Sequence, residues 1–200
     1  MTLPKNGSSS RIVSPLLIVC ISCLASSQLA SAGGLEATGP GVSEEAQQAI
    51  LLLDAKDLYT RQLAFLRLEA LREPDTVPVI REYIDSRDPD TRAFSLRALA
   101  AVGRADAVPV LLDRIQHDHE PRVRLAAILA VEPLHDPRAL PVLIRALKDR
   151  HHHVRMAAVD VVSRIDAPEA REAILIRSKK EWNHDVRRVL KDAVKRVTPQ

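Results

Sequence analysis

Apolar residues recur at helical spacing along most of the chain. Counting from Arg61, a small or apolar residue stands three, four and seven positions further on. Residues at this spacing share one face of an α-helix, so the pattern predicts an amphipathic helix with one buried stripe. The pattern occurs four times, at Ala64, Phe65 and Leu68, at Ser95, Leu96 and Leu99, at Ala127, Ile128 and Val131, and at Ala158, Val159 and Val162.

The arginines that precede these stripes mark an internal repeat. They stand 31 or 32 residues apart, and the two units between Asp88 and Asp149 can be aligned directly on each other. A fixed period of this length is typical of a solenoid, in which each unit packs against its neighbours. The predicted fold is therefore all-α, an α-solenoid of about five helix-pair repeats. Its structural anchors are Arg61, Arg92, Arg124, Arg155 and Arg187.

Each unit also has a second helical half. A proline stands 17 residues after the anchor arginine in three units, at Pro78, Pro109 and Pro141, and an apolar pair follows it. Proline is tolerated in the first turn of a helix but not in its interior, so these prolines predict where the second helices begin. The fourth unit has Glu172 at this position and keeps the apolar pair.

The first residues differ in composition from the repeats. Lys5 and Arg11 precede an apolar run, and small residues follow it up to Gly33, which is the order found in a secretory signal peptide. We expect a helix after the leader to cover the open end of the stack. The predicted organisation is a signal peptide at 1–32, a flexible linker at 33–42, a capping helix at 43–54, repeats at about 55–86, 87–117, 118–149 and 150–181, and a partial repeat at 182–200.

Two alternatives to a cleaved leader stay open. The apolar run could persist as an anchor helix, although serines and a proline interrupt it. Cys20 or Cys23 could carry a lipid, although neither lies in a well-formed lipidation motif. Both cysteines lie in the leader, so the cleaved protein would have no thiol and no disulfide. The expected location is the periplasm or the extracellular space, with a lipid-anchored envelope location as a minor alternative.

The units resemble HEAT-like repeats of the short bacterial kind also found in phycobilisome lyases. The resemblance rests on an Asp-rich turn, a Val-Arg or Thr-Arg pair, an Ala-rich first helix and a second helix such as Ala-Leu-Pro-Val-Leu-Ile. It implies a hydrogen-bonding ladder between the anchor arginines and acids of the turns. Acids stand four residues before the arginine in three units, but other residues replace them later, so we expect the ladder to weaken toward the C-terminus. These positions are Asp57, Asp88, Glu120, His151 and Asn183.

Charge is distributed unevenly along the repeats. The net charge is only +3, which argues against nucleic acid as the partner. After the leader, the net charge of successive segments changes from −4 over 33–87 to 0 over 88–149 and +5 over 150–200. Second helices usually line the concave side of such solenoids, where this gradient could steer a protein partner. A solvated face with drifting charge is the alternative interpretation. The predicted partner-binding residues are Glu82, Asp85, Asp113, Arg145, Lys148 and Lys179.

No catalytic motif is recognisable. The chain has no phosphate-binding Gly-rich loop or nucleophile elbow, and its single His-Glu pair does not match the paired motifs of HEAT-like iron oxygenases. We therefore predict no catalytic residue and no cofactor. Histidines in the turns between units could bind zinc, nickel or copper, although a solvated polar turn is the simpler interpretation. The candidate metal ligands are His151, His152, His153 and His184.

The sequence favours a non-catalytic scaffold or adaptor that binds a protein partner along the concave face. Membrane contact is expected only if the leader is retained or lipidated. The alternative is a lyase-like or metal-binding protein that handles a cofactor through its histidine turns. A weaker third possibility is head-to-tail self-association of the acidic and basic ends. Trp182, the one tryptophan, is expected to be buried between helices.

Overall fold

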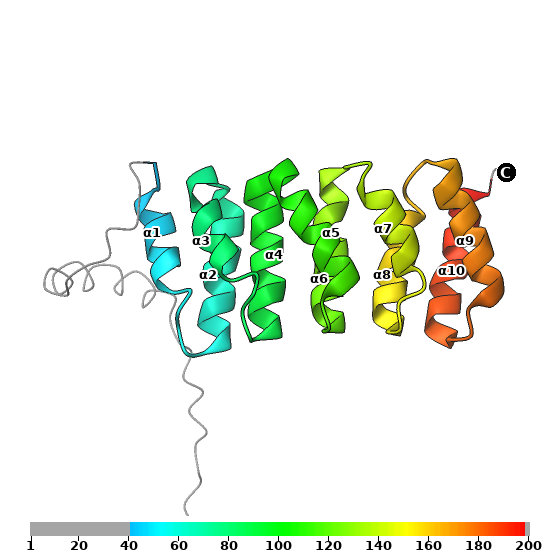
Figure 1. Cartoon of the computed structure of the whole chain (residues 1–200), viewed down its shortest axis with the longest axis horizontal. Coiled ribbons are helices and arrows are strands. Elements are labelled where there is room, and N and C mark those ends of the chain that lie inside the picture. Colours follow the sequence, from blue (N-terminus) through cyan, green and yellow to red (C-terminus); the bar gives the residue numbers. More distant parts are fainter. Residues whose placement is uncertain (1–40, 199–200) are drawn as a thin grey trace, which may run out of the picture. The chain divides into compact units, whose positions relative to one another are not determined.

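The computed structural model describes residues 41–198, and this part of the chain is helical with no strand. The predicted signal peptide and most of the predicted linker lie outside the described residues. The helices stand side by side in chain order (Figure 1). The α-helices are α1 (Glu44–Leu51), α2 (Leu58–Leu71), α3 (Val77–Glu82), α4 (Pro89–Gly103), α5 (Val108–His117), α6 (Pro121–Val131), α7 (Ala139–Ala146), α8 (His152–Val162), α9 (Pro168–Lys180) and α10 (His184–Val197). Short 3-10 helices lie at Pro74–Thr76, Arg104–Ala107 and Glu132–Leu134.

The first helices of the repeats, α2, α4, α6, α8 and α10, form one layer in which each packs against the next. All twelve small or apolar residues of the predicted stripes are buried in the structure. The first residue of each stripe is small, at Ala64, Ser95, Ala127 and Ala158, which allows neighbouring helices to approach closely. The prediction of one buried face for each first helix is confirmed.

The residue four before each anchor arginine is the N-cap of its first helix. The side chains of Asp57, Asp88 and Asn183 accept hydrogen bonds from backbone N–H groups of the first turn. Glu120 and His151 occupy the same position without a side-chain cap. This position therefore starts the helix, because its side chain satisfies N–H groups that have no partner within the helix.

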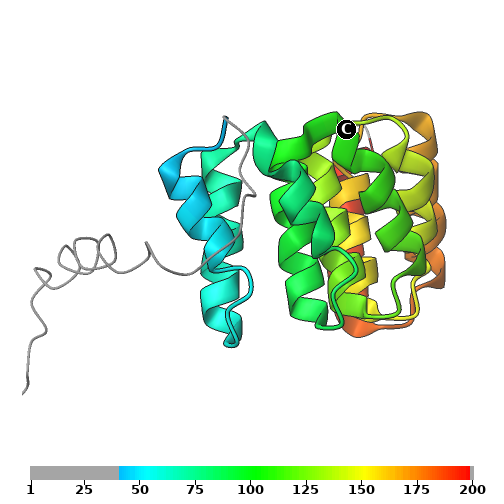
Figure 2. The same cartoon turned by 60° about the vertical axis from the view of Figure 1, so that its left-hand side comes forward.

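The second layer contains α1, α3, α5, α7 and α9 (Figure 2). Pro78 and Pro109 are the second residues of α3 and α5, and Pro141 is the third residue of α7, so the predicted helix starts are confirmed. In the fourth unit α9 begins at Pro168, four residues before Glu172. The second helices pack mainly on the first helix of the following unit, as α5 does on α6 and α9 on α10.

The core is a continuous aliphatic cluster that extends from α1 to α10. Aromatic residues make up only 2% of the chain, and the ring pair of Phe65 and Tyr83 meets edge to face with centroids 5.6 Å apart. Alanine, valine and leucine fill the remaining space between the layers. None of the helices in residues 41–198 combines the length and the apolar character that a membrane span requires.

Candidate functional site

The turns between units carry a ladder of buried ion pairs. Arg92 donates from Nε to Oδ2 of Asp118 over 3.0 Å and from Nη2 to Oδ1 over 3.1 Å. Its Nη1 donates to the carbonyl oxygen of Ser86, at 2.8 Å, in the turn of its own unit. One guanidinium thus joins two successive turns. A bidentate arginine–carboxylate pair fixes geometry as well as charge.

The same contacts recur at the two following junctions. Arg124 donates to both carboxylate oxygens of Asp149, at 2.7 and 2.8 Å. Arg155 donates to both oxygens of Glu181, at 2.9 and 3.0 Å. Both arginines also bond to backbone carbonyls five and six residues before them. The ladder therefore continues to the last junction among residues 41–198.

Of the predicted ladder acids only Asp88 is confirmed, and the predicted weakening toward the C-terminus is wrong. The acids of the last three rungs stand six residues before the following arginine, at Asp118, Asp149 and Glu181. The position four before is the N-cap, and its side chain caps its own helix at Asp57, Asp88 and Asn183. Only Asp88 does both, since it caps α4 and accepts one bond from Arg61 at 3.0 Å. This rung is the most open one, with side chains 19% and 36% exposed.

Burial and hydrogen bonding act in opposite directions on the ladder acids. Burial alone would raise the pKa of Asp118, but the bonds from Arg92 and from the Glu120 backbone outweigh it, so the pKa lies below its usual value. The pKa of Asp149 is lowered in the same way, against burial, by Arg124. For Glu181, bonds from Arg155 and Arg177 overcome burial and lower the pKa to about 2. These carboxylates are therefore charged when the protein is folded.

The rings of the three histidines at the start of α8 lie close to one another, and those of His151 and His152 are stacked. The ring centroids of His151 and His152 are 5.0 Å apart, and those of His152 and His153 are 4.0 Å apart. Burial lowers the pKa of His151, and the nearby charges of His152 and His153 lower it further. His184 is exposed. Among the described residues, no group of three or more His, Cys, Asp or Glu side chains is arranged to hold a metal ion. The metal hypothesis gains no ligand set and stays a prediction.

The expected burial of Trp182 is wrong, because its side chain is 76% exposed. It lies in the turn between α9 and α10, directly after Glu181. The carboxylate of Glu181 points inward and accepts the backbone N–H groups of Trp182 and Asn183, at 3.1 and 2.8 Å. The indole consequently lies outside the turn. The guanidinium carbon of Arg155 is 5.8 Å from the ring centroid, within cation–π range.

The six predicted partner-binding residues lie on the second helices or directly after them, and all are exposed. Two take part in contacts between units, since Asp85 pairs with Arg114 and Arg145 donates to Gln116 at 2.8 Å. A groove of about 270 Å³ lies between α7 and α9, where Ile176 is 44% exposed. Its lining residues are Ile144, Leu147, Lys148, Glu169, Glu172, Ala173, Ile176, Arg177 and Lys180.

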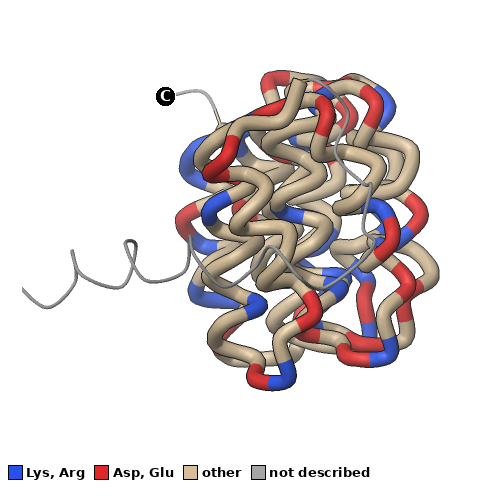
Figure 3. The backbone as a smooth tube through the Cα atoms, turned by 90° about the vertical axis from the view of Figure 1, so that its left-hand side faces the viewer, with Lys and Arg blue, Asp and Glu red and all other residues tan. Residues whose placement is uncertain are grey.

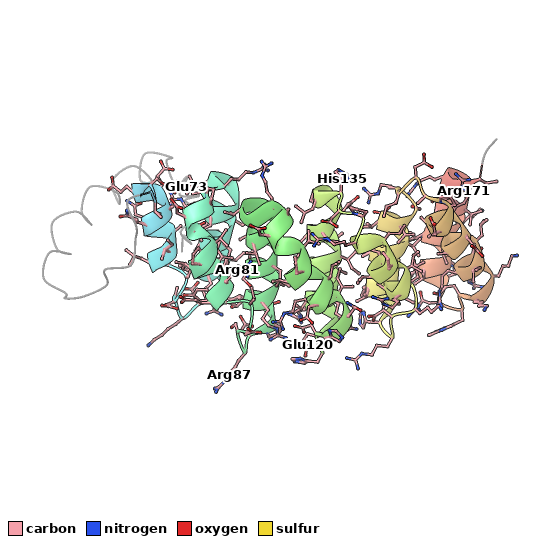
Figure 4. All side chains as sticks on the ribbon, turned by 45° about the horizontal axis from the view of Figure 1, so that its top comes forward. Glu73, Arg81, Arg87, Glu120, His135 and Arg171 are labelled. Carbon is pink, nitrogen blue, oxygen red and sulfur yellow. The ribbon has the colours of Figure 1, made fainter. Side chains whose placement is uncertain are left out.

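A feature that the sequence did not indicate lies on the edge opposite the ladder, where the two helices of each unit are joined. Figure 4 shows Glu73, His135 and Arg171 along this edge, with Arg87 and Glu120 at the ladder edge. Three residues at the inner turns have positive φ although none is glycine, at Arg72 (55°), Arg104 (46°) and His135 (50°). A hollow of about 500 Å³ spans the ends of α2, α4 and α6 beside these turns.

The comparison with protein families agrees with this architecture. A family model described as HEAT repeats matches residues 46–132 and 120–195, which together cover most of the chain. The chain belongs to the HEAT repeat family. The resemblance predicted from the anchor arginines and paired helices is confirmed, as is the α-solenoid fold.

Two solved structures share the helical fold of this chain. One similar chain is from the complex of CpcE and CpcF of phycocyanin lyase from Nostoc sp. PCC7120, with 26% identity and a TM-score of 0.61, covering 74% of this chain and 96% of that one. Another is an engineered protein with 17% identity and a TM-score of 0.50, covering 76% and 78%, and it supports the fold alone. No curated protein matches the chain.

Proposed function

We propose that this HEAT repeat protein is a non-catalytic scaffold that binds a protein partner on the surface of its second helices. The observation that carries the proposal is the groove between α7 and α9. It combines exposed apolar surface at Ile176 with the cations of Lys148 and Lys180, and an interface needs both an apolar centre and a polar rim. The α-solenoid supports the proposal because stacked repeats provide extended binding surfaces.

Charge gives this surface a direction. Glu82 and Asp85 lie at the acidic end of the stack, whereas Lys148 and Lys179 lie toward the basic end. Charged positions are visible along the turns and outer faces of the stack (Figure 3). Complementary charge steers association and selects partners more than it raises affinity. We expect a partner whose basic segment faces α3 and whose acidic segment faces α7 and α9.

We infer from the leader that the protein acts outside the cytoplasm. A basic start, an apolar run and small residues before Gly33 support export. A C-terminally tagged full-length chain should therefore appear in the periplasm or medium in a shortened form. A protein that stays in the cytoplasm at full length would contradict this part of the proposal.

A lyase-like role in handling a cofactor is the second candidate. The observation in its favour is the similarity to the chain from the phycocyanin lyase complex of CpcE and CpcF. This role requires a bound chromophore, metal or other ligand at a fixed ratio to the protein. The absorbance spectrum and metal content of the purified full-length chain distinguish the two candidates, because the scaffold role requires neither.

The scaffold role is tested by capture from envelope extracts with the tagged full-length chain. The variant Arg145→Glu/Lys148→Glu/Lys179→Glu should lose a captured protein, and raised salt should weaken its capture. The matched control is Arg67→Glu/Arg87→Glu/Lys191→Glu, which changes the net charge equally at exposed cations elsewhere. Equal capture by both variants, or equal loss in both, would show that the second-helix surface does not select the partner.

A further inference from the structure

The hollow opposite the ladder belongs to a row of three neighbouring hollows, which we call the turn-edge groove. Their volumes are about 500, 430 and 210 Å³. Asp136 lines both the first and the second, and residues 164–167 line both the second and the third. Because successive hollows share lining residues, they lie next to one another in a row from the end of α2 to the end of α10.

Apolar side chains line part of the turn-edge groove. Leu129, Pro133 and Leu134 line the first hollow, and Leu129 is 46% exposed although most of its helix, α6, is buried. Leu140 and Ile165 line the second hollow. Each is partly buried, so apolar surface is available at intervals along the edge. Exposed apolar surface in a depression with a polar rim is typical of an interaction site.

The rim of the first hollow is cationic. Arg72, Arg97 and Arg104 line it. Arg97 pairs with Glu69 at 3.2 Å, whereas the exposed guanidiniums of Arg72 and Arg104 make no hydrogen bond or ion pair within residues 41–198. The acid on the other wall, Asp136, is already held by Arg138 at 2.7 Å. Two cations thus remain available beside these apolar side chains.

Both cations stand on residues with a strained backbone. Arg72 and Arg104 have φ values of 55° and 46°, and a non-glycine residue in this region costs on the order of 1–3 kcal/mol. Gly103, the preceding residue, keeps a helical φ of −80° while the arginine takes the positive value. Attraction to a helix C-terminus accounts for a cation near these turns. It does not account for an apolar hollow between them.

We propose that the turn-edge groove binds an extended acidic segment of another protein. A carboxylate lies between Arg72 and Arg104, and apolar side chains of the segment lie on Leu129 and Leu134 and then on Leu140 and Ile165. Helices in contact are about 10 Å apart. The two steps from the turn of Arg104 after α4 to the turn of Ile165 after α8 therefore span about 20 Å, which about six extended residues cover. This length and the shared lining residues fit a chain segment better than a compact small molecule. The proposal concerns a different surface from the second-helix groove and does not rest on it.

The test uses the full chain and a fluorescein-labelled peptide of about eight residues in which Glu alternates with Leu. We expect it to bind, and the variant Arg72→Ala/Arg104→Ala to weaken binding by about tenfold or more. The matched control Arg67→Ala/Arg87→Ala, which removes two other exposed cations, should bind normally. A peptide with Lys in place of Glu should not bind. Both pairs lie at exposed positions, and thermal unfolding checks that the variants fold.

Several outcomes would overturn the proposal. These are no binding of the acidic peptide, equal binding of the Lys peptide, or equal loss in both double variants. Displacement of the peptide by an equal concentration of glutarate would assign the hollow to a small dicarboxylate instead. Self-association that Arg72→Ala/Arg104→Ala abolishes would assign it to a second copy of the chain. Failure of the second-helix proposal is distinguishable, because Arg145→Glu/Lys148→Glu/Lys179→Glu should leave peptide binding unchanged.

Discussion

The two edges of the stack use arginine in opposite ways. At the ladder edge, the side chains of Arg92, Arg124 and Arg155 are at most 5% exposed and meet acids of the next unit. At the edge of the inner turns, Arg72 and Arg104 are exposed and lie beside an open hollow. The difference is whether the following unit supplies a carboxylate within reach. Where it does, arginine joins units, and where it does not, arginine remains available to a ligand.

The backbone is satisfied by hydrogen bonds at the ladder edge and strained at the edge of the inner turns. At the ladder edge, an acid six residues before the anchor accepts a backbone N–H of its own turn as well as the guanidinium, as Asp149 does from His151 at 2.7 Å. At the other edge, the turns contain three non-glycine residues with positive φ. Strain of this kind persists where surrounding packing enforces it and is often associated with binding sites. One edge is therefore built for stability, and the other retains strain and unpaired charge.

The largest expected effect is the loss of one ladder arginine. Arg92→Leu should lower the free energy of unfolding by about 3–5 kcal/mol, because it leaves a buried carboxylate at Asp118 without its partner. The same substitution at the opposite edge, Arg104→Leu, should change it by less than about 0.5 kcal/mol. Urea denaturation of both variants measures the difference. Similar losses in the two would show that the edges do not differ in their contribution to stability.

A second variant separates the loss of the pair from the charge left behind. In Arg92→Leu/Asp118→Leu no uncompensated carboxylate remains, so part of the stability should return. If the double variant were less stable than Arg92→Leu, the carboxylate would be stabilised by other contacts, such as Arg114 at 4.0 Å.

Acid should weaken the ladder edge selectively. The pKa of Glu181 is about 2 in the folded protein against a usual value near 4.5, so the unfolded chain takes up a proton first as the pH falls. The stabilisation from this carboxylate is complete above its usual pKa and is lost progressively as the pH falls toward 2. Urea midpoints across this range should fall less steeply for Glu181→Gln than for the unmodified chain. Glu172→Gln, at an exposed acid outside the ladder, should keep the original slope.

The repeat architecture could be predicted because it depends on local periodicity. The anchor arginines and the buried stripes, such as Ala127, Ile128 and Val131, follow from spacing alone. The ladder acids could not be assigned with equal ease, since two acids precede Arg124, at Asp118 and Glu120, and only the turn conformation decides which one reaches back to Arg92. An acid six residues before the next anchor is the signal that would have identified the last three rungs.

The turn-edge groove and the exposure of Trp182 depend on tertiary geometry. The first hollow combines Arg72, Arg104 and Leu129, which come from three different units, and no short motif contains them together. Tryptophan is usually a core residue, but the carboxylate of Glu181 points inward and Trp182 lies on the outside of the turn. Features built from several units or from the direction of one turn were therefore beyond the reach of the sequence pattern.

A smaller effect is expected from relieving the strain at the turn edge. Arg104→Gly should raise the free energy of unfolding by up to about 1 kcal/mol, because glycine adopts positive φ without steric cost. The control Arg97→Gly, in the interior of α4, should lower it by about 1 kcal/mol. Arg104→Gly should also weaken binding of the acidic peptide, because it removes one of the two cations of the first hollow. A loss of stability at Arg104 would mean that its side chain contributes contacts that offset the strain.

The smallest effect concerns Trp182 at the ladder edge. Because the chain contains one tryptophan, its fluorescence reports this turn alone. A side chain that is 76% exposed should emit at long wavelength and be quenched readily by acrylamide. Trp182→Ala should lower the free energy of unfolding by about 0.5–1 kcal/mol through loss of the cation–π contact with Arg155. The matched variant Tyr59→Ala removes an exposed aromatic that has no such contact in the described residues, and it should change stability less. Short-wavelength emission that resists quenching would instead place the indole in a packed environment, so that the last rung of the ladder would be covered by a larger apolar contact.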